Sequence, residues 1–150
     1  MMNGPIPTRL VFIHELPSLA LHTKVRFLGC VARYDIVRGR LELEHNYPPL
    51  LGKKKKRDAS NVSRRVSVDI DHVLSTITRD QLQVGSWLNI FGYIRSETQG
   101  KEKSTSEDAN NSQLYVEAIM ISDAGAIRIA EYEQSLVDMQ AINRKLRLDS

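Results

Sequence analysis

The chain has little cysteine, few aromatic residues and no long apolar run. Cys30 is the single cysteine among 150 residues, and only one Trp, five Tyr and three Phe occur. A lone thiol cannot close an internal disulfide, which is typical of an intracellular protein. No apolar run reaches the roughly 18 residues that a transmembrane helix needs, and the N-terminus lacks the basic and apolar segments of a secretory signal. We therefore expect a soluble intracellular protein that has no membrane partner.

The sequence also lacks the recurrent motifs of catalytic sites. It contains no GxxxxGK[ST], GxGxxG, HExxH or GxSxG pattern. Cys30 is interpreted as a small core hydrophobe, because no histidine lies near it in the sequence. Asp69, Asp71 and His72 could hold a cation, but a solvated strand end followed by a helix cap explains them better. We expect no enzymatic activity, cofactor or metal site. The other histidines have no ligand spacing: His14, His22 and His45.

Positive charge is concentrated in one short run. The formal net charge is +3, and subtracting the five charges of this run leaves −2 for the remaining residues. Such a balance argues against a domain whose whole surface grips phosphates. Three interpretations of the run stay open: a solvated loop without a partner, a nuclear import signal, or direct phosphate contact. Its members are Lys53, Lys54, Lys55, Lys56 and Arg57.

Alternating apolar residues predict a β-hairpin near the N-terminus. The alternation runs through residues 24–27 and 41–44, and a turn containing Asp35 and Gly39 separates the two runs. Gly29 is expected to bend the first strand so that it serves two sides of a small barrel, and Gly92 to bend a later strand. The strands are predicted at 23–34, 39–46, 64–70, 87–94 and 113–122.

The order of these elements predicts an OB fold. A short helix capped by Asp71 is expected between the third and fourth strands, which is where a five-stranded OB barrel carries its helix. We expect one domain over 1–150: an N-terminal arm with one short strand (1–22), the barrel (23–122) and a C-terminal amphipathic helix (126–147). Two loops are expected within the barrel, a mobile one at 48–63 and a disordered one at 96–112 that lacks large apolar residues.

The predicted C-terminal helix carries an apolar stripe that exceeds what a small barrel needs. Intervals of three and four residues place the stripe on one helix face. We favour pairing of this face with a partner protein, and docking on the chain's own barrel is the alternative. The residues of the stripe are Ile129, Tyr132, Leu136, Met139, Ile142 and Leu146.

Single-strand binding would need basic and aromatic side chains along one groove. Several tyrosines could face outwards near arginines, although packing within the chain explains each tyrosine as well. Acidic residues in the hairpin, including Glu42 and Glu44, offset much of its positive charge. Direct DNA binding is therefore expected to be weak. The candidate residues are Arg33, Tyr34, Arg38, Arg40, Tyr93, Arg95 and Tyr115.

Four stretches resemble the smallest subunit of the telomere-capping CST complex in its filamentous-fungal form. They are PTRLVF (7–12), LPSL (16–19), TKVRFLGCV (23–31) and LELEHNYP (41–48). Beyond them the resemblance rests on the apolar pattern of residues 66–70, 84–94 and 114–121. It implies a single OB fold without enzymatic activity, similar to the smallest subunit of replication protein A.

The resemblance also implies partners and a location. Members of this family pair obligately with the OB domain of the middle CST subunit through the barrel and the C-terminal helix. With the large subunit they bind the single-stranded G-rich telomeric overhang in the nucleus, limit resection and telomerase, and assist fill-in by DNA polymerase alpha–primase. The small subunit contributes little DNA affinity. The alternative is a free-standing OB module that binds single-stranded DNA or RNA.

Overall fold

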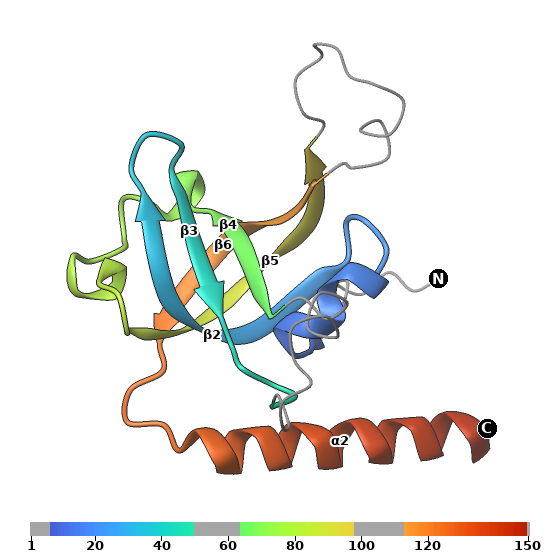
Figure 1. The fold of residues 1–150 in the computed structure, drawn as a ribbon. Coiled ribbons are helices and arrows are strands. Elements are labelled where there is room, and N and C mark those ends of the chain that lie inside the picture. The colour runs from blue at the N-terminus through green and yellow to red at the C-terminus, as the bar shows by residue number, and fades with distance from the viewer. Residues whose placement is uncertain (1–6, 50–63, 98–112, 150) are drawn as a thin grey trace.

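The computed structural model describes residues 7–49, 64–97 and 113–149, and side chains up to residue 146. Figure 1 shows strands curled around one core and a long helix, α2, lying across one end of them. The strands are β1 (Arg9–Leu10), β2 (Lys24–Asp35), β3 (Arg40–Glu44), β4 (Arg65–Asp69), β5 (Trp87–Glu97) and β6 (Gln113–Asp123), and the helices are η1 (Ile13–Ser18), η2 (Asp71–Val73), η3 (Asp80–Leu82) and α2 (Ile129–Asp149).

Five of the strands pair in a closed ring. β2 pairs with β3, β3 with β4, β4 with β6, β6 with β5, and β5 again with β2. The β4–β6 pair is parallel and the other four pairs are antiparallel, while the short β1 adds to β2 in parallel. The ring confirms the predicted five-stranded arrangement, with β1 as the short strand of the N-terminal arm.

β2 is the longest strand and serves two sides of the ring. Residues up to Cys30 pair with β5, and residues from Cys30 onwards pair with β3. The change of partner lies next to Gly29, where an added Cβ would be only 2.9 Å from the Cβ of Leu43. Gly29 therefore lets β3 approach closely, while the register irregularity of β2 lies a little later, between Val31 and Arg33.

Gly92 marks the second predicted bend. The register between β5 and β6 shifts between Phe91 and Gly92. A Cβ at Gly92 would lie 2.3 Å from the backbone oxygen of Glu117, closer than real contacts allow. Only glycine therefore permits β6 to approach β5 at this position.

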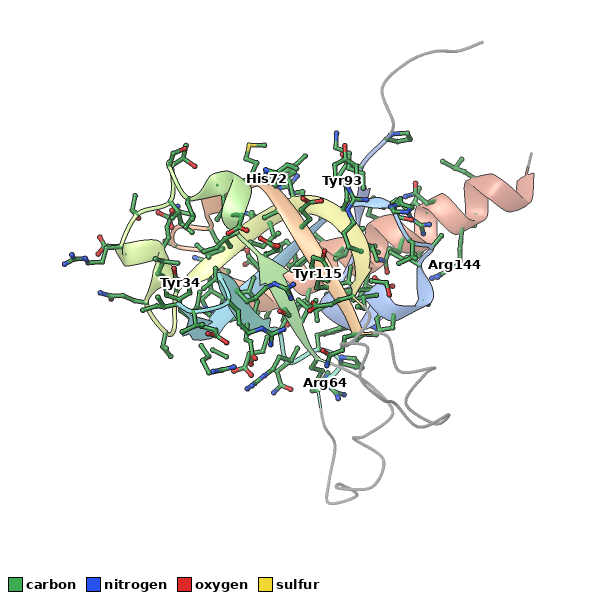
Figure 2. All side chains as sticks on the ribbon, turned by 90° about the horizontal axis from the view of Figure 1, so that it is seen from above. Tyr34, Arg64, His72, Tyr93, Tyr115 and Arg144 are labelled. Atoms are coloured by element: carbon green, nitrogen blue, oxygen red, sulfur yellow. The ribbon has the colours of Figure 1, made fainter. Side chains whose placement is uncertain are left out.

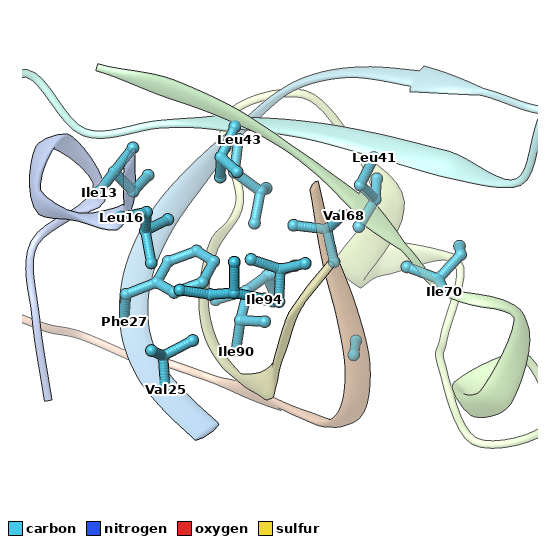
Figure 3. Close-up of a cluster of buried hydrophobic side chains, with 14 of the residues drawn as sticks. Ile13, Leu16, Val25, Phe27, Leu41, Leu43, Val68, Ile70, Ile90 and Ile94 are labelled. Atoms are coloured by element: carbon cyan, nitrogen blue, oxygen red, sulfur yellow. The ribbon is translucent and has the colours of Figure 1, made fainter. Parts of the chain in front are cut away.

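The core fills the interior of the ring with side chains from every strand of the ring and from η1 (Figure 3). Phe27, Leu43 and Ile90 are fully buried, as the alternation predicted for their strands. Ile13 and Leu16 join them from η1. Burial of apolar side chains of this size contributes about 1.5–3 kcal/mol each. This core fixes which faces of the strands point outwards.

Some local expectations need correction. The helix expected after Asp71 is present as two single-turn 3-10 helices, η2 and η3, because the Ser/Thr-rich segment between them offers few helix-forming residues. Cys30 is half-buried rather than fully in the core, and burial raises the pKa of its thiol, with Glu44 as a second cause. Ser96 and Glu97, expected in a loop, belong to β5. α2 begins at Ile129.

The basic run and the membrane expectation remain to be placed. The basic run 53–57 and most of the two predicted loops lie outside the described residues. No helix within the part of the chain that the structure describes is long and apolar enough to cross a membrane.

Candidate partner-binding and nucleic-acid-binding surfaces

The first half of α2 packs against the barrel. Leu136 is 1% exposed, although it lies on a helix outside the ring of strands. His45, just after β3 and 2% exposed, has its Nε2 2.7 Å from Oε2 of Glu133. This half of the helix therefore follows the docking alternative, and the Leu136 side chain, expected at a partner interface, is buried within the chain.

An aromatic cluster surrounds this contact. The rings of Phe12 and Tyr47 stack at 4.2 Å between centroids, and Trp87 meets the His45 ring edge-on at 5.5 Å. Tyr132 of α2 reaches the same place, 6.2 Å from the His45 ring. Burial raises the pKa of Tyr132, whose hydroxyl has no hydrogen-bond partner among the described residues. Tyr132 thus also serves the intramolecular packing.

The second half of α2 leaves its apolar face open. Gln140 Nε2 donates to Oε1 of Glu15 at 2.9 Å, which ties the helix to η1. Beside this contact Met139 is 41%, Ile142 57% and Leu146 61% exposed. A groove of about 550 Å³ separates this half from the N-terminal arm. The stripe predicted from the sequence is therefore divided: one half is docked, and the other half is available to a partner.

The seven residues expected to contact DNA do not form one surface. Figure 2 shows Tyr34, Tyr93 and Tyr115 well apart on the molecule. Tyr34 packs against the core cluster, which supports the structural interpretation of this residue. The arginines also divide: Arg33 pairs with Glu42, Arg38 and Arg40 share Glu97, and Arg95 pairs with Glu117.

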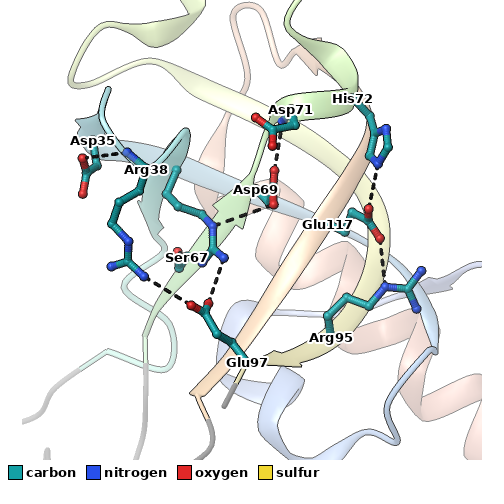
Figure 4. A network of polar contacts seen from close by, with 10 residues as sticks. Asp35, Arg38, Ser67, Asp69, Asp71, His72, Arg95, Glu97 and Glu117 are labelled. Carbon is teal, nitrogen blue, oxygen red and sulfur yellow. Dashed lines mark hydrogen bonds and ion pairs between the residues drawn. The ribbon is translucent and has the colours of Figure 1, made fainter. Parts of the chain in front are cut away.

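One group of the candidates does meet, at Arg40. Its guanidinium lies 4.2 Å from the ring centre of Tyr115. Arg40 Nη2 donates to Oε1 of Glu97 at 2.8 Å, and Arg38 Nη2 donates to the other oxygen of Glu97 at 3.4 Å (Figure 4). Arg40 Nη1 also donates to the hydroxyl of Ser67 at 3.2 Å. Two arginines, an aromatic ring and a carboxylate thus share one place: Arg38 and Arg40 at the start of β3, Tyr115 on β6 and Glu97 on β5.

This group lines a groove of about 380 Å³, which we call the arginine groove. It is lined by Ile13, Leu16, Pro17, Arg38, Arg40, Glu42, Arg65, Val66, Ser67, Glu97, Gln113, Leu114 and Tyr115. The groove lies on the face of the second and third barrel strands, the face with which OB folds bind oligonucleotides.

Carboxylates neutralise the arginines around this groove. Arg33 Nη2 donates to Glu42 at 3.1 Å, and Arg65 donates to Glu42 at 3.2 Å and to Glu44 at 3.0 Å. Glu42 thus pairs directly with the hairpin residue Arg33, whereas Glu44 pairs with Arg65 of β4. A phosphate could contact these arginines only by displacing a carboxylate, and this competition lowers the affinity for phosphate.

Arg95 and Tyr93 belong to a separate polar network on β5 and β6. Arg95 Nε donates to Oε1 of Glu117 at 2.8 Å, and His72 Nε2 lies 2.7 Å from the other oxygen (Figure 4). Hydrogen bonding by Arg95, with a smaller share from His72, holds the pKa of Glu117 below its usual range, against the effect of burial. Arg95 also contacts Nδ1 of His22 at 2.6 Å. The described residues contain no group of three or more His, Cys, Asp or Glu placed to hold a metal.

Four residues of these surfaces were not identified from the sequence. Glu97, Glu117 and Glu133 each contact a side chain that lies far away in the sequence. His45 was set aside because the histidines have no metal-ligand spacing. No local pattern points to these residues, because β-strand closure and helix docking bring the partners together. For example, His45 and Glu133 are 88 positions apart.

The closed five-stranded ring, with its parallel β4–β6 pair and outlying helix, defines an OB-fold protein. A family model for Ten1, described as a telomere-capping CST complex subunit, matches residues 1–137. The chain belongs to the Ten1 family.

Two solved structures from S. pombe have a similar fold. The Stn1–Ten1 complex matches with a TM-score of 0.61 and 24% identity, over 92% of this chain and 96% of that one. The telomere-capping protein Ten1 matches with a TM-score of 0.57 and 24% identity, over 90% of this chain and 99% of that one. No curated protein matches the chain. The likeness to these structures shows that the fold is shared, and the family model assigns the chain to a family of telomere-capping subunits.

Proposed function

We propose that this chain is the non-catalytic OB subunit of a CST complex and pairs with the middle subunit. Together with the large subunit, the pair would bind single-stranded telomeric G-rich DNA in the nucleus, protect chromosome ends and support fill-in by DNA polymerase alpha–primase. Membership of the Ten1 family supports the placement in this complex. A solved structure with a similar fold contains Stn1 together with Ten1.

The exposed half of α2 is the observation that carries the pairing proposal. Met139, Ile142 and Leu146 lie on consecutive turns, and each is at least 41% exposed. The docked half holds the helix in a fixed position on the barrel through Leu136 and Glu133. A rigid helix that presents a row of large apolar side chains is suited to pack against another helix. Of the six stripe residues, we assign partner contact to these three. Ile129 is the first residue of α2 and lies at the opposite end of the helix.

DNA contact by this subunit is proposed to be secondary. Arg33, Arg38, Arg40 and Arg95 each have a carboxylate partner within the chain. A free-standing nucleic-acid-binding module remains the second candidate, favoured by the position of Arg40 over Tyr115 in the arginine groove. The basic run from Lys53 to Arg57 keeps its proposed roles in nuclear import or phosphate contact.

Co-expression with the middle subunit tests the proposal. The two proteins should elute as a 1:1 complex in size-exclusion chromatography with light scattering. The complex should be more soluble than the isolated chain and melt at a higher temperature, since binding to the folded state stabilises it. Separate elution with an unchanged melting temperature would reject the pairing. High-affinity oligonucleotide binding by the isolated chain would instead favour the second candidate.

A further inference from the structure

The carboxylate of Glu97 occupies the arginine groove as a phosphate would. Its two oxygens accept from two different guanidinium groups, Oε1 from Arg40 at 2.8 Å and Oε2 from Arg38 at 3.4 Å. Arginines recognise carboxylates and phosphates with the same planar donor geometry. Glu97 therefore uses the donors that a phosphodiester in this groove would need.

The groove around this carboxylate is otherwise built like a single-strand site. Tyr115 provides an aromatic face, and Arg40 lies 4.2 Å from the centre of its ring. The hydroxyl of Ser67 and the side chain of Gln113 add polar groups to the lining. Bases stack on such rings while cations hold the backbone. These features favour a nucleic acid over a folded protein as the ligand.

The backbone of Arg38 and the side chain of Arg40 are held in place independently of Glu97. The turn before β3 fixes the backbone at Arg38, whose N–H donates to Oδ1 of Asp35 at 3.2 Å. Arg40 is held by Ser67 at 3.2 Å, and its Nε lies 3.9 Å from Oδ2 of Asp69. Only 14% of the Arg40 side chain is exposed, compared with 31% of that of Glu97. Loss of the Glu97 charge would thus leave the Arg40 guanidinium in position, while the Arg38 side chain, 56% exposed, would be released from its carboxylate.

We propose that Glu97 is an internal competitor that keeps a phosphodiester-binding site closed at Arg38, Arg40 and Tyr115. A single-stranded nucleic acid would bind by displacing the Glu97 carboxylate from both guanidinium groups. The inference rests on the weak nucleic-acid contact proposed above, and it names the residue that limits this contact. It does not depend on how the chain pairs with its partner.

Charge-neutral substitution of the competitor is the test. The full chain with Glu97→Gln should bind a fluorescently labelled single-stranded oligonucleotide about fivefold more tightly at low salt, because the partly buried ion pair with Arg40 no longer has to be broken. Its affinity should also fall more steeply with salt, since the freed arginines now release counterions. Fluorescence anisotropy measures both quantities.

Matched variants separate this effect from net charge. Glu131→Gln removes the same charge from a glutamate on α2 that is 69% exposed, and it should bind as the wild type does. Adding Arg40→Gln to Glu97→Gln should abolish the gain. Glu97→Asp keeps the charge but reaches less far, so it should give a smaller gain and provides a second variant if Glu97→Gln folds poorly. Circular dichroism checks the fold of each.

Equal affinities for Glu97→Gln and Glu131→Gln would overturn the proposal. If Glu97→Gln also raised the affinity for polyglutamate by a similar factor, the proposal would be overturned, because the site would then bind any anion. Pairing with the middle subunit, measured on the same variants, should not change. A loss of pairing in every variant and in the wild type would count against the proposed function and leave the result for the groove intact.

Discussion

His45 Nε2 lies 2.7 Å from Oε2 of Glu133, and this contact joins the end of β3 to the first half of α2. His45 is almost completely buried, while 23% of the Glu133 side chain is exposed. The contact fixes where the helix lies on the barrel. It therefore also fixes the direction in which the exposed half of α2 points.

Removal of this contact should weaken the docking of the helix. We expect His45→Ala to lower the free energy of unfolding by about 2–4 kcal/mol, because it removes a hydrogen bond to a charged group and leaves a cavity among aromatic rings. Urea denaturation measures the change. The exposed Arg128–Glu131 pair provides the control, since Glu131→Ala should cost less than about 1 kcal/mol. Equal losses would show that the His45 contact does not hold the helix.

The two halves of the apolar stripe should respond differently to truncation. Leu136→Ala should cost about 2–5 kcal/mol of stability in the isolated chain, as for other buried leucines. Ile142→Ala should change stability by less than about 0.5 kcal/mol, because its side chain is 57% exposed. Thermal unfolding of both variants provides the comparison. A large loss for Ile142→Ala would mean that the second half is also docked.

Gly92 should tolerate no side chain. Gly92→Ala would place its Cβ 2.3 Å from the Glu117 oxygen, so we expect a loss of about 1–3 kcal/mol or more from overpacking between β5 and β6. Gly125→Ala is the control, since nothing lies within 4 Å and only its φ of +67° opposes the change, at about 1–2 kcal/mol. Chemical denaturation should show the larger loss for Gly92→Ala, and the reverse order would contradict the close approach.

The Glu117 network should make part of the stability depend on pH. The folded-state pKa of Glu117 lies below its ordinary value of 4.5, so its contribution is present above that pH and is lost as the pH falls through the folded pKa. Glu117→Gln should therefore be less stable than the wild type at pH 7, and the gap should shrink below pH 4.5. Melting temperatures across this range test it. A gap that does not vary with pH would exclude the ionised carboxylate as the cause.

The sequence allowed the barrel to be predicted because alternation is a local property. Strands such as Trp87–Glu97 carry apolar residues at every second position, and Gly29 and Gly92 interrupt the pattern where the strands bend. The helix expected after Asp71 was less well defined, because its few apolar positions fit both a helix and a set of tight turns. Local patterns thus predicted the strands and bends more reliably than the short connection.

The surfaces depend on contacts that no local pattern contains. The periodicity of the α2 stripe is uniform, so it could not show that the burial of its apolar residues ends between Leu136 and Met139. That boundary depends on the size of the barrel. In the same way, Arg40 meets Glu97 only because the ring of strands brings β3 and the end of β5 together. The sequence showed acidic residues near the candidate arginines, but it could not show which carboxylate each arginine pairs with.

Pairing through the exposed half of α2 is the central claim, and a binding measurement with the middle CST subunit tests it most directly. Isothermal titration or co-purification would compare the wild type with the double variant Met139→Glu, Ile142→Glu. The control is Ala141→Glu, which introduces the same charge at another exposed position of the same helix turn. We predict that the double variant loses at least about 100-fold in affinity, as expected when central apolar contacts are removed, while it folds normally and Ala141→Glu binds like the wild type. Wild-type affinity of the double variant would contradict the account.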